Sequence, residues 1–260
     1  IEEIKRIEQV FSIFGDGEAA SLNKEASKTP FVCSDEMWFI LGESKKYFEK
    51  SEHAFDITIK PMMTLWGFYR KRNEIPSDKE IMQTLSNVGF DKLILDENSK
   101  SIFFKSPDMS VDFGGIVKGY AVDMAVAKIA EKGVKSGFIN LGGNIRTLPE
   151  PPPGKDFYNI GIRDPLDKEK ICAFAKIADS KAIATSGNYE RYIILENKHI
   201  THIIDPSDGQ PVENMLSVTV VAPDALTADA LSTSVFIKGG ALAKKLHNEN
   251  PAIGAAQKNI

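Results

Sequence analysis

The sequence predicts an α+β fold, because helical and strand-like patterns occupy different stretches of the chain. Apolar residues recur at helical spacing over much of the first ninety residues, whereas short apolar runs bounded by turn residues dominate beyond residue 90. Neither a tandem repeat nor a long linker interrupts the 260 residues. We therefore expect one domain over residues 1–260, with largely antiparallel sheet flanked by helices.

The composition is that of a globular protein without a nucleic-acid role. Hydrophobic residues make up 42% of the chain and charged residues 26%, and the net charge of −4 lacks the basic excess typical of nucleic-acid binding. No apolar run reaches the length of a membrane span. Cys33 and Cys172 are too few for a disulfide framework or a paired-Cys zinc site, so we expect two buried, inert thiols.

The chain opens inside a helical pattern. Apolar residues recur at helical spacing from Ile1 to Phe14, and no capping residue precedes them. We therefore expect that upstream sequence is missing here, which leaves room for a targeting or anchoring segment.

Further elements follow in order. Ser34 is the expected N-cap of a helix over residues 34–50, and Ser77 with Glu80 forms a capping box for a helix over residues 77–88 that Gly89 ends. Strands are predicted at residues 93–95, 102–105, 137–144, 158–163, 173–178, 192–196, 199–204 and 216–222. A helix that ends at residue 130 and helices over residues 227–236 and 240–247 are also predicted.

The segment VDFGGIVKGYAVD (residues 111–123) combines the parts of a phosphate site. It is predicted as a short strand, a Gly114-Gly115 turn and a helix start. A turn without Cβ atoms lets a ligand approach the backbone, a helix start offers unpaired N–H groups, and Lys118 adds positive charge. Taken alone, the motif fits a packing turn equally well, and it has the spacing of neither a P-loop nor a dinucleotide fingerprint.

Two later segments also combine glycine with polar residues. In NLGGNIR an apolar strand runs into Gly142-Gly143, and in TSGNYERY small hydroxyl residues flank Gly187. The first pairs with the Gly114-Gly115 turn to favour a shared ligand cradle. The second, on composition alone, fits a polar turn that opens a hairpin.

Three side chains are candidates for chemistry. His202 ends a predicted strand and is suited to proton transfer near neutral pH, although most histidines are structural. Asp229 and Thr233 lie four residues apart on one face of a predicted helix, with Thr227 as its expected cap. Their oxygens suit Mg²⁺, while the alternative for Asp229 is that it satisfies a helix N-terminus.

Five segments together resemble the ApbE family of flavin transferases. They are VDFGGIVKGYAVD, INLGGNIR, ATSGNYERY, HIIDPSDGQPV and ADALSTSVF, in this order, and AFDITIKPMMTLWGF (residues 54–68) is similar to the family's N-terminal half. The resemblance covers nearly the whole chain and implies an ApbE-like fold.

The resemblance also implies an activity. Members of this family bind FAD, cleave its pyrophosphate with Mg²⁺, and pass FMN to a Thr or Ser hydroxyl of an acceptor flavoprotein while AMP leaves. By similarity, the metal ligands are the carbonyl of Gly115 with Asp229 and Thr233, and the catalytic residues are His202 and Asp229. The FAD-binding residues implied in this way are Ala54, Phe55, Asp56, Lys118, Asn140, Gly142, Gly143, Ser186, Gly187, Tyr189, Arg191, His202 and Ile203.

Two other activities remain open beside this one. An FAD pyrophosphatase would use water in place of the acceptor hydroxyl, and a flavin-storage protein would bind FAD without turnover. Storage needs no metal pair, so the presence of Asp229, Thr233 and His202 argues against it.

The sequence departs from the family pattern at two positions. Asn144 and Asn188 stand where family motifs often carry Asp. Because Asn keeps most hydrogen bonding without ionising, we expect both changes to be tolerated. Family members are often exported and lipid-anchored, so the resemblance implies a place at the cell envelope, on the outer face of the cytoplasmic membrane or in the periplasm.

Overall fold

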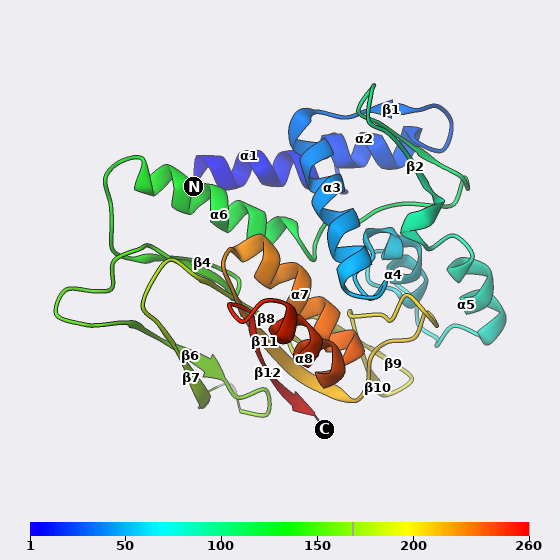
Figure 1. Ribbon diagram of the computed structural model, residues 1–260. Coiled ribbons are helices and arrows are strands. Elements are labelled where there is room, and N and C mark those ends of the chain that lie inside the picture. The colour runs from blue at the N-terminus through cyan, green and yellow to red at the C-terminus, as the bar shows by residue number, and fades with distance from the viewer. Residues whose placement is uncertain (168, 260) are drawn as a thin grey trace. The chain divides into compact units, whose positions relative to one another are not determined.

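A computed structural model describes residues 1–167 and 169–259 (Figure 1). The described residues group into two compact units. The first unit takes residues 1–4, 116–190 and those from 214 onward, and the second takes residues 5–115 and 191–213. The segments VDFGGIVKGYAVD and TSGNYERY are therefore each divided between the units. The expectation of a single domain stays a prediction.

Helices dominate the second unit, and they begin where the sequence provides caps. Ser34 Oγ accepts a hydrogen bond from Met37 N–H at 3.1 Å ahead of α3 (Asp35–Lys50). Ser77 and Glu80 form the predicted capping box ahead of α5 (Asp78–Leu85). The other helices here are most of α1 (Glu2–Phe11), α2 (Glu18–Glu25), α4 (Lys60–Trp66) and the short 3-10 turns η1 (Ile57–Ile59) and η2 (Phe90–Lys92).

Two small antiparallel sheets belong to the second unit. β1 (Phe31–Val32), β3 (Ser101–Phe104) and β2 (Leu93–Asp96) lie side by side in that order. β9 (Tyr192–Leu195) and β10 (Lys198–Thr201) form a hairpin from the strands predicted at residues 192–196 and 199–204, with its turn one residue earlier than the predicted residues 197–198. Its two turn residues, Glu196 and Asn197, have φ of 48° and 64°, as a two-residue turn of type I′ requires.

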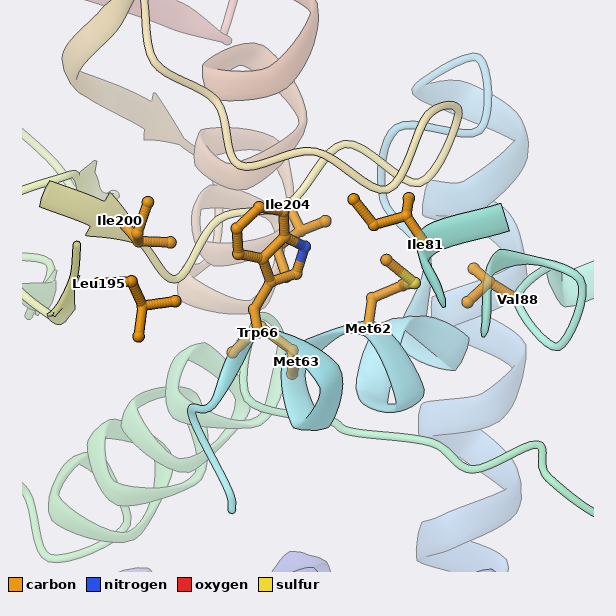
Figure 2. Packing of buried hydrophobic residues seen from close by; sticks show 8 residues of the cluster. All are labelled: Met62, Met63, Trp66, Ile81, Val88, Leu195, Ile200 and Ile204. Carbon is orange, nitrogen blue, oxygen red and sulfur yellow. The ribbon is translucent and has the colours of Figure 1, made fainter. Parts of the chain in front are cut away.

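The core of the second unit gathers around Trp66 (Figure 2). Trp66 Nε1 donates to the carbonyl of Gly209 at 2.8 Å, which satisfies the indole N–H among apolar side chains. Ile200 and Ile204 belong to this cluster, so it fixes the segment between them, which carries His202. Its buried members are Met62, Met63, Trp66, Ile81, Val88, Leu195, Ile200 and Ile204.

A five-stranded antiparallel sheet forms the base of the first unit. β11 (Met215–Ala222) is a run of β-branched residues, and alternate side chains Val218 and Val220 are fully buried. The spatial order of the strands is β12 (Gly254–Asn259), β11, β8 (Ala182–Gly187), β5 (Asn144–Thr147) and β4 (Phe138–Leu141).

This sheet is a middle layer. On one face, α7 (Ala225–Lys238) packs against β8 and β11, α6 (Val117–Ala130) packs against α7 and β5, and α8 (Gly240–Glu249) lies beside α7 (Figure 1). Ser186 points to that face and Ile183 to the other, because side chains alternate along a strand. There Ile183 packs against the hairpin of β6 (Tyr158–Arg163) and β7 (Ile171–Ile177).

Several sequence predictions need correction. Residues 111–113 are irregular and form no strand, and the backbone of Asp112 bonds instead to Ile57 O at 2.7 Å. The cap of α7 is Asp224 and not Thr227, since the Asp224 carboxylate accepts from the N–H of Thr227 at 2.7 Å. Cys172 is exposed on the β6–β7 hairpin, while Cys33 is buried as expected. No helix among the described residues is long and apolar enough to cross a bilayer.

Candidate active site

The starts of α6 and α7 each donate backbone N–H groups to an aspartate of the other helix. Asp229 of α7 accepts from Gly119 N–H at 2.9 Å, and Asp123 of α6 accepts from the N–H groups of Ala225 and Leu226 at 2.8 and 2.9 Å. The first N–H groups of a helix have no partner within it, so each carboxylate satisfies donors of its neighbour. The reciprocal bonding brings two positive helix-dipole ends together.

Gly119 makes this close approach possible. A Cβ atom at position 119 would lie 2.1 Å from the carbonyl oxygen of Ala225, which is backbone and cannot rotate away. The two helices can therefore cross here only if residue 119 has no side chain.

Lys118 forms an ion pair with Asp229 at this crossing. Its Nζ atom lies 3.1 Å from Oδ1 and 3.4 Å from Oδ2 of the carboxylate. The Asp229 side chain is 5% exposed and that of Lys118 is 48% exposed. The ammonium thus lies on the solvent side of the carboxylate, where a phosphate group could reach it.

Hydroxyl groups gather one turn further along α7. Thr233 Oγ1 lies 3.4 Å from Ser186 Oγ of β8, and Ser186 Oγ lies 2.9 Å from Ser232 Oγ. Thr233 Oγ1 also lies 3.5 Å from the backbone oxygen of Asp229. This arrangement confirms that Asp229 and Thr233 belong to one region of the first unit.

The residues present fit a hard divalent cation. One carboxylate and neighbouring hydroxyls are oxygen donors of the kind that Mg²⁺ prefers. In the described part of the chain, no three His, Cys, Asp or Glu side chains gather in a metal-binding arrangement. A cation at Asp229 would therefore depend on this carboxylate, on neutral oxygens and on the oxygens of a bound phosphate. Gly115 belongs to the second unit, and its role as a ligand stays a prediction.

Asp123 also pairs with Arg146 of β5. The Arg146 Nη1 atom lies 2.6 Å from Asp123 Oδ1, and burial raises the pKa of Asp123 against the opposing effect of its hydrogen bonds. Asn144 Nδ2 and Arg146 Nε are buried donors that have no hydrogen-bond partner among the described residues. A carboxylate at position 144 would remove one of these two unpartnered donors, because it carries no N–H group.

The glycine pair of NLGGNIR is a hairpin turn. Gly142 and Gly143 join β4 to β5 with φ of 57° and 94°, a conformation that favours glycine. Asn140 Oδ1 accepts from the N–H of Gly143 at 3.0 Å. The turn is exposed, and the structure accounts for all three residues without a ligand. Their role in binding FAD stays a prediction.

The end of β8 carries three more candidates. Ser186 faces the hydroxyl cluster described above. A Cβ atom at Gly187 would lie 2.7 Å from the ring of Tyr189, so glycine lets that ring fold back on the strand. Burial raises the pKa of the Tyr189 hydroxyl.

In the second unit, His202 is held in one tautomer. Its Nδ1 atom lies 2.9 Å from the carbonyl oxygen of Arg191. Because a carbonyl can only accept, Nδ1 carries a proton, and in the neutral ring the lone pair is therefore on Nε2. The neighbouring Ile203 is buried in the core and is 5% exposed.

Arg191 is itself fixed by aromatic rings. Its guanidinium lies 5.7 Å from the ring centre of Phe68 and 5.3 Å from that of Tyr69, and it donates to the carbonyl of Phe68 at 3.2 Å. The Tyr69 hydroxyl in turn donates to the carboxylate of Asp112. Burial, and then the charge of Asp112, raise the pKa of Tyr69.

Ala54, Phe55 and Asp56 lie in the interior of the second unit, with 1%, 4% and 7% exposed. The Asp56 carboxylate accepts from the N–H groups of Thr58 and Phe90 at 2.8 and 3.1 Å. Burial raises its pKa against these bonds. Asp56 is thus the N-cap of η1. The role of residues 54–56 in lining a flavin nucleotide stays a prediction.

The Gly114-Gly115 turn does not need glycine for its conformation, because neither residue has a positive φ. The N–H of Gly114 donates to Asp112 Oδ1 at 2.7 Å, which makes an Asx turn.

Two residues that build the helix crossing were not singled out from the sequence. Gly119 and Asp123 are four residues apart on α6, and Ala225 and Asp229 have the same spacing on α7. A small residue followed by Asp four positions later in both helices was the available signal, since such pairs share a helix face.

Antiparallel sheets together with packed helices define an α+β protein. The N-terminal ends of α6 and α7 meet at the ion pair of Lys118 and Asp229, and this place is a candidate site for a polyanion and a divalent cation. Comparison with known proteins gives the particular family. The model of the ApbE family matches residues 1–256. The chain belongs to the ApbE family, and the ApbE-like α+β fold predicted from the sequence is confirmed.

Named relatives of this chain support the assignment to the ApbE family. The FAD:protein FMN transferase of Escherichia coli (strain K12) is 31% identical over 236 residues, which covers 89% of this chain and 67% of that protein. The enzyme of the same name from Haemophilus influenzae is 31% identical over 251 residues, 94% of this chain and 70% of that protein.

Solved structures show the same fold. The crystal structure of the ApbE protein from Thermotoga maritima has a TM-score of 0.91 and 30% identity, and covers 99% of this chain and 84% of that chain. The flavin transferase ApbE from Vibrio cholerae has a TM-score of 0.83 and 26% identity, and covers 98% and 83%. The site roles assigned by resemblance are not tested by these comparisons.

Proposed function

We propose that this protein transfers FMN from FAD to a Thr or Ser hydroxyl of an acceptor flavoprotein in an Mg²⁺-dependent reaction that releases AMP. The names of its relatives support flavin transfer. The observation that carries the proposal is the joined start of α6 and α7, with Lys118 and Asp229 at the crossing.

The chemistry suits such a site. The acceptor oxygen attacks the phosphorus of the FMN half, a new phosphoester bond forms, and the bond to the bridging oxygen breaks so that AMP leaves. A pyrophosphate is a concentrated anion, so the reaction depends mainly on charge neutralisation and alignment. Lys118 and two helix starts supply positive charge in the first unit.

Asp229 and Thr233 are the residues of the first unit that would hold Mg²⁺. The ion supplies a Lewis acid for phosphate oxygens when it is bound. The support is the donor set, one nearly buried carboxylate with a hydroxyl one helical turn away.

His202 is the proposed base for the proton of the acceptor hydroxyl. The hydrogen bond from Nδ1 to the carbonyl of Arg191 supports this role, because it leaves the lone pair on Nε2. The rings of Phe68 and Tyr69 hold the guanidinium of the same Arg191.

Incubation with FAD and Mg²⁺, with and without an acceptor fragment, separates the three possible activities. Transfer predicts AMP together with an FMN adduct on the acceptor, and both vanish with EDTA. AMP and free FMN at the same rate with or without the acceptor would indicate a pyrophosphatase. Intact bound FAD after prolonged incubation would indicate storage.

We also propose, on the family resemblance alone, that the protein works at the cell envelope through an anchor that precedes this sequence. Fractionation of cells that express the full-length protein tests this, and recovery in the soluble cytosolic fraction would contradict it.

A further inference from the structure

Lys118 and a divalent cation need the same carboxylate. The ammonium faces both oxygens of Asp229, at 3.1 and 3.4 Å, and the N–H of Gly119 takes a further position on Oδ2 at 2.9 Å. Because the Asp229 side chain is only 5% exposed, water screens charges beside it weakly. Two cations on this carboxylate would repel each other.

The Lys118 ammonium can move away from Asp229. Its side chain is 48% exposed, and a lysine ammonium on a flexible four-carbon chain can move without disturbing the helix. The hydrogen bond from Gly119 to Asp229 comes from the backbone, so the carboxylate stays in place when the ammonium departs.

We propose that a divalent cation displaces the Lys118 ammonium from Asp229, and that the displaced ammonium then binds the phosphates of the nucleotide. The inference rests on the proposed function, since it takes Asp229 as a metal ligand. Cation binding and nucleotide binding should therefore strengthen each other, because the nucleotide phosphates replace Asp229 as the partner of the Lys118 ammonium.

Mn²⁺ binding, followed by the loss of the free-ion EPR signal, tests this without any turnover. The full chain is titrated with Mn²⁺ alone and with Mn²⁺ in the presence of ADP as the diphosphate probe. The test variants are Lys118→Met and Lys118→Gln, whose folding is checked by thermal melts. Lys128→Met is the matched control, because Lys128 lies on the same helix and pairs only at the surface with Glu131 at 3.5 Å among the described residues.

Both Lys118 variants should bind Mn²⁺ alone about fivefold more tightly than the wild type, the lower range of ordinary coupling between sites. ADP should raise the Mn²⁺ affinity of the wild type by a larger factor than that of either variant. The Lys128 variant should match the wild type, and Asp229→Asn should lose the binding.

Two contrary results have different meanings. If Asp229→Asn loses Mn²⁺ while the Lys118 variants bind it no more tightly than the wild type, competition is overturned and the metal site stands. If Mn²⁺ binding does not depend on Asp229, the metal assignment of the proposed function fails together with this inference.

Discussion

At the scale of single residues, Asp229 is the side chain on which the proposed chemistry depends most. The sequence left two interpretations open, a metal ligand or a residue that satisfies a helix N-terminus. The structure shows that it does satisfy a helix start, namely that of α6 and not of its own helix. The same carboxylate faces Lys118 and lies one turn from Thr233, so the metal interpretation stays available as a proposal.

Asp229→Asn should lower the rate of AMP release from FAD by about a hundredfold or more, because a neutral amide is a poor ligand for Mg²⁺. The amide oxygen can still accept from Gly119, so the fold should persist. Asp224→Asn is the control, since Asn caps a helix about as well as Asp and should leave the rate unchanged. An Asp229→Asn enzyme with wild-type rates would remove Asp229 from the mechanism.

The two cysteines should differ in reactivity. Burial, and then the charge of Glu18, raise the pKa of Cys33 to about 12, so almost no thiolate is present at pH 8. Cys172 is exposed. A thiol titration with an aromatic disulfide should therefore show one fast thiol, and Cys172→Ser should abolish it. A fast thiol that survives this substitution would contradict the packing around Cys33.

Glu80 should make stability depend on acid pH. Its bidentate pair with Arg72, and then its bonds to Ser77, lower its pKa from 4.5 to about 2. The folded protein binds fewer protons than the unfolded chain between these values, so this stabilisation is present above about pH 4.5 and is lost as the pH falls toward 2.

Urea unfolding of the wild type and of Glu80→Gln, compared from pH 7 to pH 3, measures this effect. The variant should be less stable at pH 7, and the difference should shrink as the pH falls. A difference that is constant over this range would show that the carboxylate charge of Glu80 contributes nothing.

At the scale of elements, the crossing of α6 and α7 places the candidate site. Gly119→Ala should destabilise the protein by about 2–3 kcal/mol, because its Cβ would lie 2.1 Å from a backbone oxygen of α7. Gly42→Ala is the matched control. Gly42 lies inside α3 with open space at its Cβ position, so alanine there should stabilise by about 0.5–1 kcal/mol.

Denaturant midpoints of these two variants measure both changes. A Gly119→Ala protein as stable as the wild type would mean that the helices do not approach each other this closely.

Elements with local signals could be predicted from the sequence. The caps at Ser34 and Ser77 and the run of β-branched residues in β11 depend on neighbouring residues alone. By contrast, α2 is short and polar, and β12 (GAAQKN) contains few strand formers, so neither was predicted. β12 is a strand because it pairs with β11, and tertiary pairing overrides weak propensity.

The residues of the candidate site could also be predicted only in part. Lys118, Asp229, Thr233 and His202 could be singled out from local patterns, because each depends on its neighbours in the sequence, and the family resemblance then implied their roles. The roles of Gly119 and Asp123 were not predicted, because they depend on which two helices meet, and that is a long-range property of the fold.

At the scale of the whole molecule, the family match covers residues 1–256, so the resemblance is not confined to one motif. The candidate residues are distributed over both compact units. Lys118, Asp229 and Thr233 belong to the first unit, and His202 and Arg191 belong to the second.

The central claim is that FMN passes covalently from FAD to a protein hydroxyl. Its most direct test is mass spectrometry of a threonine-containing acceptor fragment after incubation with this protein, FAD and Mg²⁺. The account predicts an FMN adduct on the threonine, formed together with an equal amount of AMP and absent when EDTA is added. An unmodified acceptor beside fully consumed FAD, or an adduct that forms equally well with EDTA, would contradict it.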